Sequence, residues 1–261
     1  MPVLLSFHND PQVKARYLQR VRQHAQANEI VKGRYWDGGK GCAVGCTIHG
    51  ADHGEYEAAL GLPRWLAWLE DTLFEHLPPG RARSFPAEML DAIPVGKDLD
   101  HVKEQFLLFL LEENVQRVRE LNLGSPVKSR VLAALSQCRR CYDAIQDGKI
   151  DRAKLARSAE TAARSARAQA VLAELVAGSP RYALSARSAQ AAAAAATEAA
   201  LSAQGYKEEA QSRSVGWSAL SARTAAAIAE DVDEALAEAS TAEDEAYVRY
   251  ADKLIELLKA A

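Results

Sequence analysis

The fold class rests on Leu184-Ser185-Ala186-Arg187-Ser188-Ala189, a run that returns as Leu220-Ser221-Ala222-Arg223-Thr224-Ala225. A looser copy, Leu155-Ala156-Arg157-Ser158-Ala159, precedes both of them. Alanine is the strongest helix former, and the leucines recur on one side, so we expect ordered helices here and not a disordered tail. The recurrence is typical of a degenerate helical repeat. It predicts an alanine-rich antiparallel helical bundle or short solenoid over residues 151–261.

Helix signals also fill the chain before this region. Asn9-Asp10-Pro11 is typical of a capped helix start, and Phe85-Pro86 predicts the start of a short helix that stops near Ile93. An apolar stripe at helical spacing is formed by Leu66, Leu69, Leu73 and Leu77. No segment alternates convincingly as a strand would. We therefore predict an all-α protein in which a compact helical N-terminal domain, residues 1–150, is followed by the alanine-rich array.

The overall composition narrows the class of protein. The 261 residues include 32 basic and 35 acidic side chains, a formal net charge of -3 that indicates neither nucleic-acid nor anionic-membrane binding. No apolar run is long enough to span a bilayer. Four cysteines are too few for a secreted disulfide scaffold of this length. We expect a soluble cytoplasmic protein with free or metal-bound thiols.

Chemistry-bearing side chains crowd into one segment, Gly39-Lys40-Gly41-Cys42-Ala43-Val44-Gly45-Cys46-Thr47-Ile48-His49-Gly50-Ala51-Asp52-His53. Thiols and imidazoles bind soft metal ions, and they act as nucleophile and base near neutral pH. On one continuous helix the two cysteines and two histidines would share a stripe of about 16 Å. One zinc ion cannot gather four ligands spread so far. The helix must therefore break, or other residues must contribute.

The first functional hypothesis is an intracellular helical metal-binding protein with zinc or iron as the ion. Cys46, His49 and His53 are the expected ligands, with Glu57 as a further or orienting ligand. The next helix carries three more carboxylates, Glu70, Asp71 and Glu75. A helical hairpin between the two segments would make imidazoles and carboxylates face each other, as in metal sites of helical bundles.

Two alternatives stay open. In one, the protein is an enzyme that uses Cys42 or Cys46 as nucleophile and His49 or His53 as base, since a thiol after a glycine turn at a helix start is activated by the helix dipole. In the other, it is a structural or host-interaction protein without chemistry. The same glycine turn could cradle a phosphate, although it lacks the phosphate-loop pattern.

The other two cysteines and the alanine-rich tail carry expectations of their own. Cys138 and Cys141, one turn apart on a predicted helix, are expected to pack, or else to supply two thiolates to the first cluster. The alanine-rich helices are expected to form a surface for a homo-oligomer or for an unknown protein partner.

The N-terminal part resembles a family of hypothetical proteins encoded by bacteria and phages. The resemblance lies in Phe7-His8-Asn9-Asp10-Pro11, Tyr35-Trp36, the block Gly39-Lys40-Gly41-Cys42-Ala43-Val44-Gly45-Cys46-Thr47-Ile48-His49, His53, Tyr56-Glu57 and Leu69-Glu70-Asp71. Members of this family carry an alanine-rich tail of variable length, as this chain does. The resemblance implies a phage or mobile-element setting and brings no activity with it.

Overall fold

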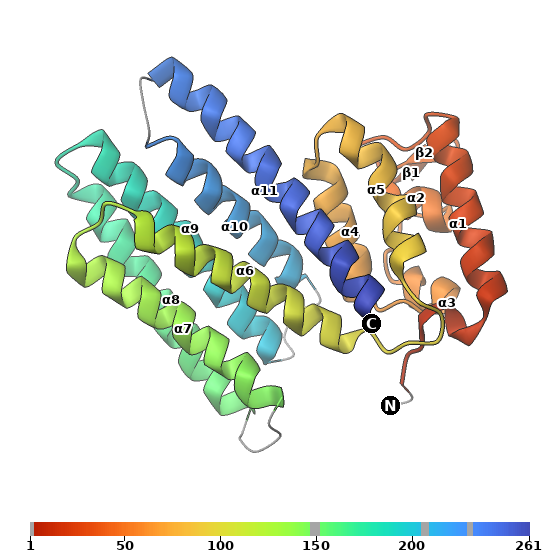
Figure 1. Ribbon diagram of the computed structural model, residues 1–261, viewed down its shortest axis with the longest axis horizontal. Coiled ribbons are helices and arrows are strands. Elements are labelled where there is room, and N and C mark those ends of the chain that lie inside the picture. Colours follow the sequence, from red (N-terminus) through yellow and green to blue (C-terminus); the bar gives the residue numbers. More distant parts are fainter. Residues whose placement is uncertain (1–2, 147–151, 205–208, 229–231) are drawn as a thin grey trace. The chain divides into compact units, whose positions relative to one another are not determined.

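In the residues that the structure describes, the protein is all-α apart from one two-stranded sheet, as the sequence predicts (Figure 1). The computed structural model describes residues 3–146, 152–204, 209–228 and 232–261. The N-terminal elements are η1 (Ser6–Asn9), α1 (Pro11–Gln26), β1 (Trp36–Asp37), β2 (Lys40–Gly41), α2 (Ala43–Ile48), α3 (Glu55–Leu60), α4 (Arg64–His76) and α5 (Pro79–Ala92). They are followed by α6 (Asp100–Glu120), α7 (Ser125–Gln146), α8 (Arg152–Leu175), α9 (Pro180–Ala203), α10 (Ala210–Ala226) and α11 (Val232–Ala260). Within the described ranges, no helix combines the length and hydropathy needed to cross a bilayer.

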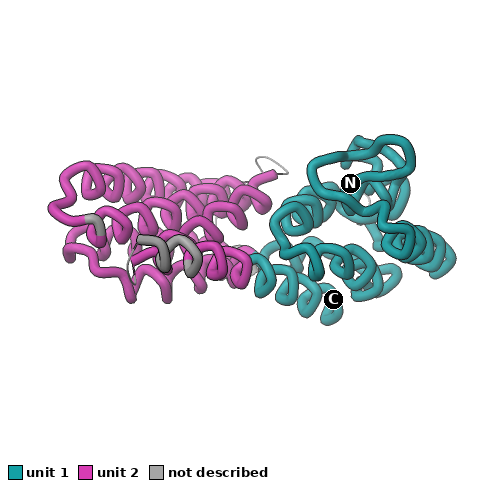
Figure 2. Tube along the Cα trace, turned by 90° about the horizontal axis from the view of Figure 1, so that it is seen from above, with its two compact units in different colours: residues 1–106, 247–261 teal, residues 107–246 magenta. Residues whose placement is uncertain are grey.

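The chain divides into two compact units, which Figure 2 distinguishes by colour. Unit 1 comprises residues 1–106 with 247–261, and unit 2 comprises residues 107–246. The units change after residue 106 and again after residue 246, whereas the composition suggests a single boundary at residue 150. The reason is that α7, which is not alanine-rich throughout, packs against α8 and α9 and so belongs with the alanine-rich helices.

Unit 1 is built around helices that pack on one another, α1 on α2 and α5, and α4 on α2 and α5. The predicted start of α1 is confirmed, since the Asp10 side chain accepts the N–H of Gln12 and Pro11 occupies the first helical position. The predicted apolar stripe of α4 is confirmed as well. Leu66, Leu69 and Leu73 are fully buried, as is Leu77 directly after the helix.

Helix α5 departs from the expectation for Phe85-Pro86. The helix begins at Pro79, and Pro86 lies inside it. Proline is favoured at the first helical position, and that preference is used at Pro79. Both Phe85 and Pro86 are buried in the core of unit 1. The prediction that a helix starts at Phe85-Pro86 is therefore wrong, because burial of the pair outweighs the backbone hydrogen bond that proline forfeits.

Unit 2 places α9 among three neighbours, α7, α8 and α10. The alanines at positions 191 to 196 face in every direction around the helix, and each of them is at most 2% exposed. A helix that is apolar all round is a buried helix, and alanine lets its neighbours approach closely. The expectation that the alanine-rich region is ordered helix is thus confirmed for the residues that the structure describes.

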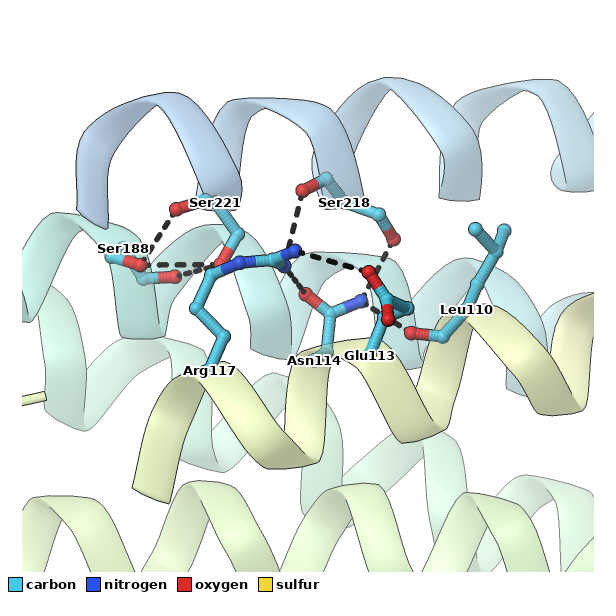
Figure 3. A network of polar contacts seen from close by, with 7 residues as sticks. All are labelled: Leu110, Glu113, Asn114, Arg117, Ser188, Ser218 and Ser221. Atoms are coloured by element: carbon cyan, nitrogen blue, oxygen red, sulfur yellow. Dashed lines mark hydrogen bonds and ion pairs between the residues drawn. The ribbon is translucent and has the colours of Figure 1, made fainter. Parts of the chain in front are cut away.

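A buried polar network links α6, α9 and α10 inside unit 2 (Figure 3). Asn114 Nδ2 donates to the Ser218 hydroxyl at 2.8 Å, and Arg117 donates to Asn114 Oδ1 at 3.1 Å. Ser188 and Ser221 donate to each other's backbone carbonyl oxygens at 2.9 and 3.1 Å. These two serines come from the two copies of the repeat. A satisfied buried network of this kind sets the register in which the alanine faces meet.

Candidate functional site

The glycine-rich turn forms a hairpin. Trp36 pairs with Gly41 and Asp37 with Lys40, and the connecting residues Gly38 and Gly39 have φ of 58° and 87°. Positive φ at both central positions is the requirement of a type I′ hairpin turn, which glycine meets without strain. The predicted turn is confirmed. It closes a hairpin and does not directly open a helix, so its own glycine amides do not cap α2.

Two further glycines allow α2 to lie against the carbonyl group of Tyr35. A Cβ atom at Gly41 would come within 2.2 Å of that oxygen, and one at Gly45 within 1.7 Å. The N–H of Cys42 donates to Arg34 O at 2.6 Å. Cys42 thereby becomes the N-cap of α2, with its Sγ accepting the N–H of Gly45 at 3.4 Å. The expectation of a cysteine at a helix start is met.

Helix α2 ends after Ile48, because His49 adopts the left-handed conformation with φ 57° and ψ 43°. This break separates the side chains that a continuous helix would have aligned. Cys46 points to the backbone, with its Sγ 3.4 Å from Gly41 O and 3.6 Å from Glu29 O. Glu57 accepts the N–H of Arg64 at the start of α4 at 3.2 Å. Cys46, His49, His53 and Glu57 therefore have different neighbours and do not form one site.

Five residues from four segments meet instead in the interior of unit 1. We call them the buried cluster: Cys42, His53, Tyr56, Glu70 and Asp71. The Tyr56 hydroxyl donates to Glu70 Oε2, and the Asp71 carboxylate lies near enough to the Cys42 thiol to raise its pKa. His53 Nε2 lies 3.5 Å from Asp71 Oδ2. An imidazole and a carboxylate thus face each other, as expected for His53 and α4.

Aromatic rings hold the His53 imidazole in place. It stacks on Trp68 with a centroid distance of 4.4 Å and an interplanar angle of 4°. Tyr35 meets the same ring edge-on at 5.5 Å. His53 is 4% exposed, Cys42 is 1% exposed and Glu70 is fully buried. The cluster is therefore preorganised and largely shielded from solvent, with Asp71 at its more exposed edge, 13% exposed at the side chain.

Burial governs the protonation of the cluster. It raises the pKa of the Cys42 thiol, and the neighbouring carboxylates Asp71 and Glu70 raise it further. Burial, with the charge of Asp71, likewise raises the pKa of Glu70 to about 8, despite the hydrogen bond from Tyr56. The pKa of Tyr56 is raised by burial and by Glu70. At neutral pH all three groups retain their protons.

The cluster leaves several polar atoms without partners. His53 Nε2, Glu70 Oε1 and Asp71 Oδ1 are buried and make no hydrogen bond. Buried polar atoms are nearly always paired, and each unpaired one costs about 1–3 kcal/mol. Three such atoms on neighbouring side chains indicate a binding site for a cation, which would accept their lone pairs.

His49 lies in a second place, which we call the histidine pocket. Its lining residues are Arg16, Gln19, Arg20, Gln23, His24, Ala27, Glu29 and His49. His24 Nδ1 lies 2.7 Å from Glu29 Oε2, and His24 Nε2 lies 2.8 Å from His49 Nε2. Trp36 stacks on His49 at 4.7 Å. No motif pairs two histidines that stand 25 residues apart, so sequence reasoning missed His24 and Glu29.

The other thiols are also held as neutral groups. Burial raises the pKa of Cys46 to about 11. In α7 of unit 2, Cys138 donates to Ala196 O at 3.2 Å and Cys141 donates to Gln137 O at 3.3 Å. Both have a raised pKa, for which burial is the main cause. These contacts agree with the expectation that Cys138 and Cys141 pack, Cys138 against α9 and Cys141 within α7.

Among the described residues, no three His, Cys, Asp or Glu side chains stand in ready-made metal geometry. Comparison of the chain with protein-family models, with curated proteins and with solved structures finds no match. The phage or mobile-element setting stays a prediction.

Proposed function

We propose that the protein binds one zinc ion at the buried cluster, with Cys42, His53 and Asp71 as ligands and Glu70 as the fourth. The observation that carries this proposal is the set of unpaired buried atoms, His53 Nε2, Asp71 Oδ1 and Glu70 Oε1. A cation would satisfy all of them at once. Of the ligands expected from the sequence, this assignment retains His53. Cys42, Asp71 and Glu70 take the place of Cys46, His49 and Glu57.

The spacing of the two best-placed ligands fits such an ion. His53 Nε2 and Asp71 Oδ2 are 3.5 Å apart. Two ligands about 2.0–2.1 Å from a tetrahedral zinc ion are separated by about 3.3 Å, so little movement is needed. The same carboxylate lies near the Cys42 thiol and raises its pKa. Closing the site requires side-chain adjustments of Cys42 and Glu70 toward the ion.

The charges also fit. The buried Glu70 carboxylate and the buried Cys42 thiol are costly as anions, which is why both groups hold their protons. A divalent ion supplies the missing positive charge and displaces both protons. Tyr56 and Trp68 would orient the Glu70 carboxylate and the His53 ring from behind.

A closed site favours a structural role over catalysis. Catalytic zinc keeps an open position for water or substrate, whereas structural zinc is enclosed by four protein ligands. Cys42, His53, Tyr56 and Glu70 are buried, the Asp71 side chain is only 13% exposed, and Cys42 is protonated at neutral pH. The zinc ion would therefore stabilise unit 1 as a scaffold. The cysteine-nucleophile alternative would need a thiolate that this environment disfavours.

Elemental analysis of protein purified without chelators or a histidine tag tests the proposal. We expect about one zinc per chain, lost in Cys42→Ser and His53→Gln variants. The matched controls are Cys46→Ser and His49→Gln, which change the same residue types outside the cluster and should keep the metal. Circular dichroism establishes that each variant folds. Metal-free wild-type protein that takes up no zinc on reconstitution, or equal loss in the control variants, would overturn the proposal.

A further inference from the structure

The histidine pocket is chemically distinct from the buried cluster and opens to solvent. It has a volume of about 490 Å³, and one face of α1 supplies most of its lining. Arg16 and Arg20 lie one helical turn apart on that face, and His24 follows one turn later. A pocket of this size fits a small ligand.

The two arginines are held in place. Their guanidinium groups each lie 4.9 Å from the ring centroid of Tyr17, a cation–π contact that restrains both side chains. Arg20 donates one N–H to Thr47 O at 2.9 Å. Because a guanidinium carries five donors in a planar fork, Arg20 keeps donors for a ligand.

The histidine pair adds an imidazole N–H donor to the pocket. A carboxylate only accepts, so Glu29 places the proton of His24 on Nδ1 and leaves Nε2 as an acceptor for His49 Nε2–H. The pair thus shares one proton between two facing nitrogens. If His49 turns away from His24, its Nε2–H becomes available as a donor to a ligand in the pocket.

The charges around His49 therefore favour an anion. Arg16 and Arg20 face the pocket from α1, together with His24, and Glu29 is the single carboxylate in the lining. That carboxylate is already engaged by His24. Two guanidinium groups together with an imidazole N–H match a dianion better than a monoanion, which one arginine would satisfy.

We infer that the histidine pocket binds a phosphate monoester, whose oxygens accept from Arg16 and Arg20 while the His24–His49 pair donates to the remaining oxygen. The inference is independent of the zinc site, because no residue is shared between the two places. It assigns the pocket to a small phosphorylated ligand and not to a nucleic acid, in keeping with the net charge of -3.

Calorimetric titration of the full chain with phenyl phosphate tests this inference, with benzoate as the monoanion of the same ring. We expect phenyl phosphate to bind and benzoate to bind at least about tenfold more weakly. Arg16→Gln and Arg20→Gln should each weaken phenyl phosphate binding about tenfold or more. Arg22→Gln is the matched control, since Arg22 lies on the same helix but pairs with Asp91 at 3.4 Å.

Nuclear magnetic resonance of the histidine rings locates the ligand. Phenyl phosphate should shift the ring signals of His24 and His49 and leave those of His53 in place. Equal binding of benzoate, equal loss in Arg22→Gln, or absence of binding at millimolar phenyl phosphate would overturn the inference. Tighter binding of a single-stranded oligonucleotide than of phenyl phosphate, or competition by zinc for the His24–His49 pair, would overturn it as well.

Discussion

Replacing Gly45 by alanine should destabilise unit 1 even though alanine is the better helix former. A Cβ atom at this position would stand 1.7 Å from Tyr35 O and 2.8 Å from Tyr35 C. Both are backbone atoms, which cannot rotate away as the end of a side chain can. The two segments must separate by more than an ångström before the contact becomes tolerable, and Cys42, the cap of α2, would move with them.

The magnitude follows from two opposing effects. Alanine in a helix gains about 1 kcal/mol over glycine through its propensity. Overpacking in a buried site costs about 1–3 kcal/mol, and more where the backbone itself must shift. The clash with Tyr35 is at the severe end, so we expect a net loss of at least about 2 kcal/mol in the free energy of unfolding. The zinc affinity of Cys42 should fall with it.

Chemical denaturation followed by tryptophan fluorescence measures the change, because Trp36, Trp65 and Trp68 lie in unit 1 and Trp217 lies in unit 2. Gly216→Ala is the matched control. Gly216 lies inside α10, and a Cβ there meets nothing within 4 Å, so alanine should stabilise unit 2 by up to about 1 kcal/mol. An unfolding midpoint of Gly45→Ala at or above that of the wild type would refute the close approach to Tyr35.

Three further outcomes follow from buried groups, each with its own measurement. Asn114→Ala should lower the free energy of unfolding by about 2–3 kcal/mol, because Ser218 and Arg117 lose a buried partner. The control Gln116→Ala, on the exposed side of α6, should change it by no more than about 0.5 kcal/mol. Equal effects of the two substitutions in denaturant unfolding would contradict the role of the network. Burial, together with Arg20 and His24, lowers the pKa of His49, so the unfolded chain binds a proton at higher pH than the folded protein does. The free energy of unfolding should therefore fall as the pH drops below about 6.5. His49→Gln should flatten that part of the pH–stability profile, and an unchanged profile would count against this reasoning. All four thiols should react slowly with iodoacetamide at pH 7 in the folded protein, since burial raises every cysteine pKa, and fast selective labelling of Cys42 would instead support the nucleophile alternative.

Part of the geometry around Cys42 and His53 could be predicted from the local sequence. The glycine turn before Cys42 and the start of a helix at that residue follow from short-range preferences, which act within one or two turns of chain. The facing of His53 and an acidic residue of α4 also follows, because the short connection through Gly61 returns the chain on itself. Its partner on α4 turned out to be Asp71.

Other parts depend on residues that no local pattern connects. The left-handed conformation of His49 turns that side chain away from Cys46 and toward His24 of α1. Pro86 sits inside α5 because its neighbours bury it, although a proline at that place reads as a helix start. Such outcomes are decided by which surfaces meet, and a single sequence carries little information on that.

The sequence by itself determined that this chain is helical, where many helices begin, and that its alanine-rich helices pack closely, because propensity and capping are properties of neighbouring residues. Only the tertiary structure decided which thiols, imidazoles and carboxylates lie next to one another and which of them are charged. Cys42 carries a thiol, which as a thiolate would be a nucleophile, yet burial beside Asp71 keeps it protonated. Solvent exclusion is a property of the packed fold, and it sets the protonation from which any chemistry must start.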